Sequence, residues 1–88
     1  MVYVWKDHGD CTFAFRAQVT KFKTKKDLEI FEGWREVGHG NCPKGYPIKI
    51  FKKEFLTEQK FYDWAKTAPV PIYETRYWGS KEKTEKIN

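Results

Sequence analysis

The sequence predicts a small α+β domain in which a mostly antiparallel sheet carries two helices on one face. Segments rich in β-branched and aromatic residues are interspersed with two amphipathic, capped segments in the order ββαβαβ. The chain has 88 residues, enough for one domain, and seven Phe, five Tyr and four Trp can fill a small core. Chains of this length often add a metal or a disulfide. We expect one domain over 1–79 and a polar flexible tail over 80–88.

The first two predicted strands form a hairpin. Residues 2–6, VYVWK, are β-branched and aromatic, as is typical of a strand. Residues 11–22 then alternate, with Phe15 and Val19 on one face and Arg16 on the other, which indicates a half-buried strand. The turn-forming residues DHGD between the two segments predict the tip of the hairpin.

A helix is expected over 24–38. Thr24 is a good N-cap, and Asp27 three residues later is typical of a capping box. Gly38 stands where a glycine commonly ends a helix, although Gly33 inside the segment weakens the pattern. The apolar side chains of one helical stripe are Ile30, Phe31, Trp34 and Val37.

The second half of the chain repeats this alternation of element types. Residues 39–45 are predicted to be loop, and 46–52 and 71–79 to be strands. Between these strands, residues 56–69 predict a second helix that ends at a proline. Its start has a capping threonine, Thr57, and the positions of a hydrophobic staple are occupied by Leu56 and Phe61.

Two hexamers hold every His and Cys of the chain. DHGDCT at 7–12 and GHGNCP at 38–43 each contain His-Gly-x-Cys. Glycine permits the sharp turn that would bring two side chains, three residues apart, onto one ion. Thiolate sulfur and neutral imidazole nitrogen are the usual ligands of tetrahedral zinc. The predicted ligands of a single metal are His8, Cys11, His39 and Cys42.

The paired hexamers resemble the zinc knuckles of zinc-ribbon and rubredoxin-type sites, in which two short hooks face each other. The resemblance covers the two hooks alone, and here His replaces the more usual first Cys of each hook. It implies a structural Zn²⁺ that staples the fold, because four protein ligands leave no open position for catalysis. The alternatives are two unconnected turns with Cys11 in the core, a Cys11–Cys42 disulfide, or a cysteine nucleophile.

The charge balance suggests an anionic partner. The net charge is +5 and the isoelectric point is about 9.2, as in proteins that bind nucleic acid or another polyanion. Four lysines lie between residues 21 and 26, and two of them fall in the first turn of the predicted helix. Lysine in that turn opposes the helix dipole and favours a phosphate-binding end. The candidate phosphate contacts are Arg16, Lys21, Lys23, Lys25, Lys26, Lys49, Lys52, Lys53 and Arg76. A mildly basic solvated surface is the competing interpretation.

Aromatic side chains on the last predicted strand could stack unpaired bases. Tyr73, Tyr77 and Trp78 surround Arg76 on this segment, although aromatic residues in a short chain more often belong to the core. The acidic residues of the first predicted helix argue against its lying along phosphates and fit a protein contact. These residues are Glu29, Glu32 and Glu36.

Several classes of protein are disfavoured. No apolar run approaches 18 residues, so no membrane partner is expected. The first residues lack the pattern of a signal peptide, which favours a reducing cytoplasm. No catalytic signature is present, so we do not expect an enzyme.

These observations together predict a small zinc-stabilised accessory protein that binds RNA or single-stranded DNA through basic patches. The alternative is a non-enzymatic protein-binding regulator or inhibitor, of the kind that viruses and mobile elements encode.

Overall fold

The structure is a computed structural model that describes residues 2–7, 13–20, 22, 24–41, 43–78 and 81–88, without the side chains of Tyr77 and Trp78. The described elements are β1 (Val2–Lys6), β2 (Ala14–Thr20), the 3-10 helix η1 (Lys25–Phe31), β3 (Arg35–Asn41), β4 (Pro47–Glu54), α1 (Glu58–Thr67), β5 (Ile72–Trp78) and β6 (Lys81–Lys86).

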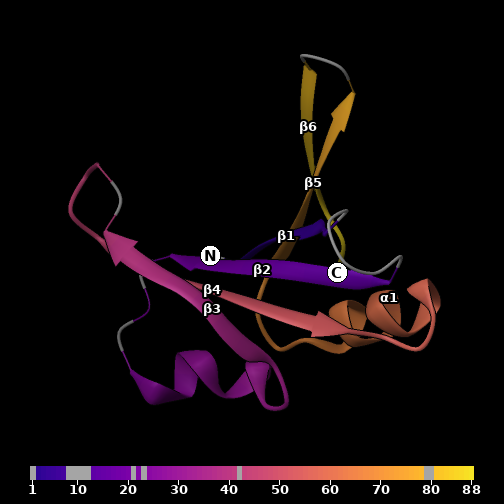
Figure 1. Ribbon diagram of the computed structural model, residues 1–88, viewed down its shortest axis with the longest axis horizontal. Helices are drawn as coiled ribbons and strands as arrows, with labels where there is room; N and C mark the ends of the chain where they lie inside the picture. Colours follow the sequence, from indigo (N-terminus) through magenta and orange to yellow (C-terminus); the bar gives the residue numbers. More distant parts are fainter. Residues whose placement is uncertain (1, 8–12, 21, 23, 42, 79–80) are drawn as a thin grey trace.

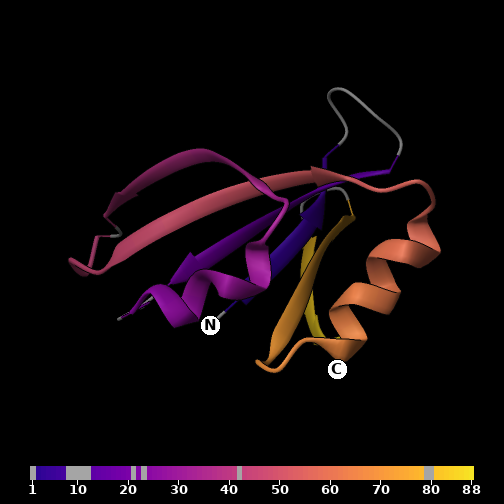
Figure 2. The ribbon, with the colours of Figure 1, turned by 90° about the horizontal axis from the view of Figure 1, so that it is seen from below.

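All six of these strands belong to one mixed sheet of order β3-β4-β2-β1-β5-β6. The strand pair β1·β5 is parallel, whereas the other four neighbouring pairs are antiparallel. The parallel pair arises because the chain leaves β4, runs through α1 and returns beside β1 (Figure 1). Figure 2 shows η1 and α1 on the same side of the sheet, as the sequence predicts.

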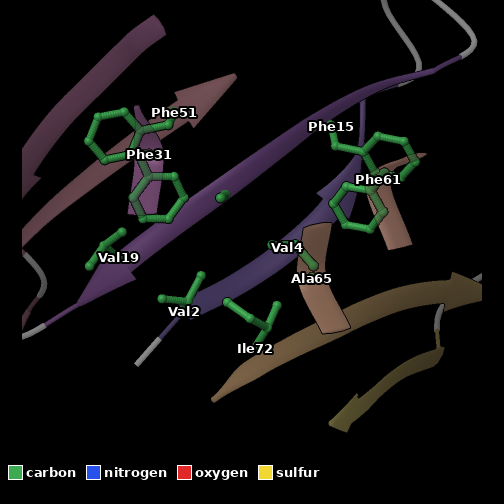
Figure 3. Close-up of a cluster of buried hydrophobic side chains, with 10 residues drawn as sticks. Val2, Val4, Phe15, Val19, Phe31, Phe51, Phe61, Ala65 and Ile72 are labelled. Atoms are coloured by element: carbon green, nitrogen blue, oxygen red, sulfur yellow. The ribbon is translucent and has the colours of Figure 1, made fainter. Parts of the chain in front are cut away.

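The core lies between the sheet and the two helical segments. Alternate side chains of β1 and β2 point into it, and Ile72 extends the buried face to β5. Each helical segment is fixed to the sheet by one stack of two rings, and both stacks are visible in Figure 3. Phe61 of α1 stacks on Phe15 at 3.7 Å between ring centroids, and Phe31 of η1 stacks on Phe51 at 4.6 Å.

The prediction of one helix over 24–38 is wrong beyond Phe31. The helix begins as expected, because the Thr24 N–H donates to the Asp27 carboxylate at 2.9 Å. Gly33 then takes φ of +84°, a left-handed conformation that ends the helical turn and reverses the chain. Residues 35–41 consequently form strand β3, including three residues of the predicted loop. The predicted order of elements along the chain, ββαβαβ, therefore lacks this strand.

The last residues also depart from expectation. Residues 81–86, predicted to belong to a flexible tail, form strand β6 along β5. Asn88 secures this end, since its side-chain amide donates to the carbonyls of Ala68 and Val70 at 3.1 and 2.7 Å. Its side-chain oxygen accepts from the Ile72 N–H at 2.9 Å. The segment after α1 and the first residue of β5 are thus tied to the last residue of the chain.

Helix α1 begins as the sequence predicts. The Thr57 hydroxyl accepts from the Lys60 N–H at 3.3 Å. The predicted hydrophobic staple is wrong, because Leu56 is 84% exposed while Phe61 is fully buried. Phe61 instead stacks on Phe15 of β2, which gives its ring a large apolar partner in the core.

Candidate nucleic-acid interface

The sheet face away from the helices carries aromatic and polar side chains. Val2 and Val4 of β1 are buried in the core, so Tyr3 and Trp5 lie on the opposite face, where both are half-buried. Tyr73 of β5 is the cross-strand partner of Tyr3, and their ring centroids are 5.7 Å apart. The parallel pairing of β1 and β5 therefore gathers three rings on the open face.

A shallow hollow of about 620 Å³ adjoins these rings. The hydroxyls of two of its lining residues, Thr75 and Thr84, lie 3.2 Å apart. Gln18 comes from β2, and Glu82 provides an acceptor at the β6 side. The hollow thus combines flat apolar surface with hydrogen-bonding groups. Its lining residues are Tyr3, Trp5, Gln18, Thr75, Glu82 and Thr84.

A row of basic residues crosses the same face beside the hollow. Trp5, Arg16, Lys52 and Arg35 are successive cross-strand partners on β1, β2, β4 and β3. At about 4.8 Å between neighbouring strands, the three basic residues span roughly 10 Å, and Trp5 stands at one end of the row. Asp7 also lies on this face, with its Oδ2 atom 2.8 Å from Lys52 Nζ and 3.3 Å from Arg16 Nε.

The predicted basic residues are divided between both faces rather than gathered on one. Arg16 and Lys52 belong to the open face. Lys49 and Lys53 alternate with Lys52 onto the helix-bearing face, where their ammonium groups lie over the rings of Phe22 and Phe55 at 5.5 and 5.3 Å. These two lysines therefore do not extend the row.

The remaining predicted phosphate contacts lie elsewhere. Lys25 and Lys26 are exposed in the first turn of η1, where Asp27 already accepts from one of the terminal N–H groups. Arg76 is bound to acidic and phenolic groups on the helix-bearing face. Lys21 and Lys23 lie outside the described residues.

Arg76 belongs to a hydrogen-bonded group that joins α1 to β5. Tyr62 donates its hydroxyl proton to Glu74 Oε1 at 2.8 Å, and Arg76 donates to Tyr62 and to Glu74 Oε2 at 3.3 and 3.2 Å. Burial, followed by the bond to Glu74, raises the pKa of Tyr62 above 10.0. The hydrogen bond and charge of Glu74, followed by those of Tyr62, raise the pKa of Arg76. This group ties α1 to the sheet, and the Arg76 guanidinium interacts with Glu74 and Tyr62 of the protein rather than with the open face.

The predicted stacking residues are located only in part. Tyr73 lies on the open face, whereas the side chains of Tyr77 and Trp78 are outside what the structure describes. Reasoning from the sequence missed Tyr3 and Trp5, although the alternation of valine and aromatic residues in VYVWK signals one buried and one aromatic face.

Three of the four predicted metal ligands, His8, Cys11 and Cys42, lie outside the described residues. His39 is on β3 with its side chain 80% exposed, and its Nδ1 atom lies 3.8 Å from Glu36 Oε1. No group of three or more potential metal ligands occurs among the residues that the structure describes.

The described residues His39 and Phe13 are bonded at different points along and just beyond β4. His39 pairs with Lys49, whereas Phe13, which follows the first hexamer, accepts a backbone hydrogen bond from Phe55. Six residues of extended chain correspond to roughly 20 Å. Residues 35–41, which include His39, follow η1 as strand β3 rather than as the end of a helix and a loop.

No protein-family model, curated protein or solved structure matches this chain. Within the described ranges, no helix is both long enough and apolar enough to cross a membrane.

Proposed function

We propose that this protein binds single-stranded nucleic acid, RNA or DNA, on the open face of its sheet. The observation that carries the proposal is the cluster of Tyr3, Trp5 and Tyr73 beside a polar-lined hollow, with Arg16 next to it. Stacking of a base on an aromatic side chain contributes about 1–3 kcal/mol, and it requires an unpaired base. Gln18 and Thr75 supply the hydrogen-bonding groups that base edges need.

The electrostatics of the face are consistent with this proposal. Arg16 is adjacent to the rings, and Lys86 is the cross-strand partner of Tyr73. Binding of phosphates by such groups releases counterions, so affinity falls as the salt concentration rises. Because the basic residues on this face are few, we expect modest affinity and a shallow salt dependence rather than the steep dependence of a protein with many phosphate contacts.

The proposal is tested by fluorescence anisotropy of labelled homopolymeric oligonucleotides, titrated with wild-type protein and with Tyr3→Ala and Trp5→Ala. Each substitution is expected to weaken binding by about tenfold, the effect of losing one stacked base. The control is Leu56→Ala, which removes a large exposed side chain before α1 and should leave affinity unchanged. Equal binding by all four proteins would contradict the proposal.

A protein-binding regulator is the second candidate, and the balance of charge on the open face favours it. Arg16, Lys52 and Lys86 are accompanied there by Asp7 and by two exposed glutamates, Glu54 and Glu82. A mixed surface of this kind, with aromatic side chains, is also typical of protein interfaces. Capture of a protein partner that persists after nuclease treatment and does not change with salt concentration would favour this function over nucleic-acid binding.

A structural Zn²⁺ bound by His8, Cys11, His39 and Cys42 is a further proposal, and its support is the donor chemistry and the paired spacing. Native mass spectrometry with and without a chelator tests it. The proposal expects one zinc to be lost, together with melting at lower temperature. An unchanged mass and an unchanged melting curve would rule out a structural metal.

A further inference from the structure

Arg16 combines a fixed position with unused hydrogen-bonding capacity. Its Nε atom donates to Asp7 Oδ2 at 3.3 Å, and its side chain is 39% exposed. The Arg16 side chain forms no other hydrogen bond or ion pair with a residue that the structure describes. The N–H groups of its two terminal nitrogens therefore remain available for a ligand.

Asp7 is itself held in place by the buried side chain of Lys52. Lys52 Nζ lies 2.8 Å from the same Oδ2 atom, and the Lys52 side chain is only 4% exposed. A lysine this deeply buried cannot reach a ligand on the surface, so its charge acts on Asp7. The low dielectric of a partly buried site strengthens the ion pair between Lys52 and Asp7. The stronger pair restricts the orientation of the Asp7 carboxylate.

We propose that Arg16 is the phosphate-binding residue of the open face and that the Asp7–Lys52 pair positions it beside Trp5. This inference rests on the proposed function. A guanidinium group offers two parallel donors that match two oxygens of a phosphate. A base stacked in the hollow on Trp5 places its phosphate at the edge of the hollow, where Arg16 is the cross-strand neighbour.

The same row gives the path of the nucleic acid. Beyond Lys52 the next partner is Arg35 on β3, which is exposed and forms no ion pair with a described residue. It lies two strands, about 10 Å, from Arg16. The strand of nucleic acid therefore crosses the sheet roughly perpendicular to the β-strands, from the hollow toward β3, with Arg35 as a second and weaker phosphate contact.

Substitution of Asp7 separates positioning from simple charge. Asp7→Asn makes the protein more positive by one unit, so an effect of net charge alone would tighten binding. If Asp7 positions Arg16, the same substitution weakens binding by about threefold or more, because the guanidinium loses its charged partner. The matched control is Glu29→Gln, which makes the same charge change on an exposed residue of η1. It should leave the affinity unchanged or slightly tighter.

The phosphate contact is tested in anisotropy titrations of an oligonucleotide over a range of salt concentrations. Arg16→Gln should weaken binding by about fivefold and reduce the slope of log affinity against log salt by about 0.7, the value for one lost contact with a single strand. Arg16→Lys should keep most of the slope and lose about threefold in affinity, since charge remains without the guanidinium geometry.

The outcomes distinguish this inference from the proposed function. If Tyr3→Ala and Trp5→Ala lose binding but the Arg16 variants keep wild-type affinity and slope, the inference is wrong and the function stands. Binding by Asp7→Asn that is as tight as wild type, with an unchanged circular dichroism spectrum, overturns the positioning role. If Asp7→Asn fails to fold, equal affinity of Arg16→Lys and wild type overturns the guanidinium contact instead. Wild-type binding without any effect of the aromatic variants rejects both.

Discussion

The two faces of the sheet are built from the same strands and differ in almost every other respect. On the helix-bearing face, Val4, Phe15 and Ile72 are at most 2% exposed and pack against the rings of two helical segments. On the open face, Tyr3 and Trp5 remain half-exposed among polar side chains. Alternation along one strand therefore separates residues that stabilise the fold from residues that are available to a partner.

The basic residues divide in the same way. Lys49 and Lys53 on the helix-bearing face lie over aromatic rings, and Lys49 also lies 3.7 Å from Glu36. Their aliphatic stems cover the rim of the core. On the open face, Lys52 is buried against Asp7, whereas Arg16 is an accessible cation next to Trp5. Neighbouring lysines of one strand thus have different roles because they point to different faces.

The largest effect is expected from the helix-bearing face. Phe61→Ala removes a fully buried ring that stacks on Phe15, and it should lower the free energy of unfolding by about 3–5 kcal/mol. Chemical denaturation measures the loss. Tyr3→Ala, the comparison on the open face, should lose less than half as much. Equal losses would show that the open face is as important to folding as the core, which would weaken its assignment as a binding surface.

A smaller effect is expected at Asn88, which ties the segment after α1 to the first residue of β5. Asn88→Ala removes three hydrogen bonds to the backbone at Ala68, Val70 and Ile72. Because these groups are only partly buried, water can replace some of the bonds, and the expected loss is about 1–2 kcal/mol in thermal or chemical unfolding. Asn88→Asp serves as a control that retains only the acceptor. A melting temperature identical to wild type would show that β6 does not secure the end of α1.

The smallest effect is a change in alkaline stability. The raised pKa of Tyr62 means that the folded protein keeps this proton at pH values where the unfolded chain, with a pKa near 10.0, has lost it. The stabilisation is therefore complete below pH 10 and is lost as the pH rises through the folded-state pKa. Tyr62→Phe removes this titration together with the bond to Glu74.

The variant Tyr62→Phe should be less stable than wild type at neutral pH, and the difference should narrow as the pH rises above about 10. Urea denaturation at a series of alkaline pH values measures this difference. A difference that stays constant with pH would show that Tyr62 titrates alike in the folded and unfolded chain, and that its link between α1 and β5 is not sensitive to protonation.

Local patterns predicted several elements correctly. The β-branched and aromatic composition of residues 2–6 and the alternation within 11–22 indicated strands, of which the second is shorter, Ala14–Thr20. Thr24 and Thr57 marked the starts of both helical segments. The predicted helix runs too far beyond Phe31 because the sequence pattern places its end at Gly38 and not at Gly33. Gly33 rather than Gly38 takes the left-handed conformation, a choice made by the pairing of β3 with β4 and not by the helix itself.

The last strand was hidden for a related reason. The segment KEKTEK has no buried residue and little strand propensity, so its composition is that of a solvated tail. It is a strand because β5 offers it an unpaired edge, and its exposed lysines suit the outermost position of a sheet. Such pairing depends on a neighbour that no window of sequence contains.

The sequence by itself determined the class of the domain, the central strands and the helix starts, because these follow from short-range periodicity and capping. The tertiary structure decided which residues meet. The parallel pairing of β1 with β5 brings Tyr3 to Tyr73, and the register of β2 with β4 brings Lys52 beneath Asp7 and Arg16. Residues distant along the chain become neighbours only through strand pairing and burial, so their site emerges with the fold.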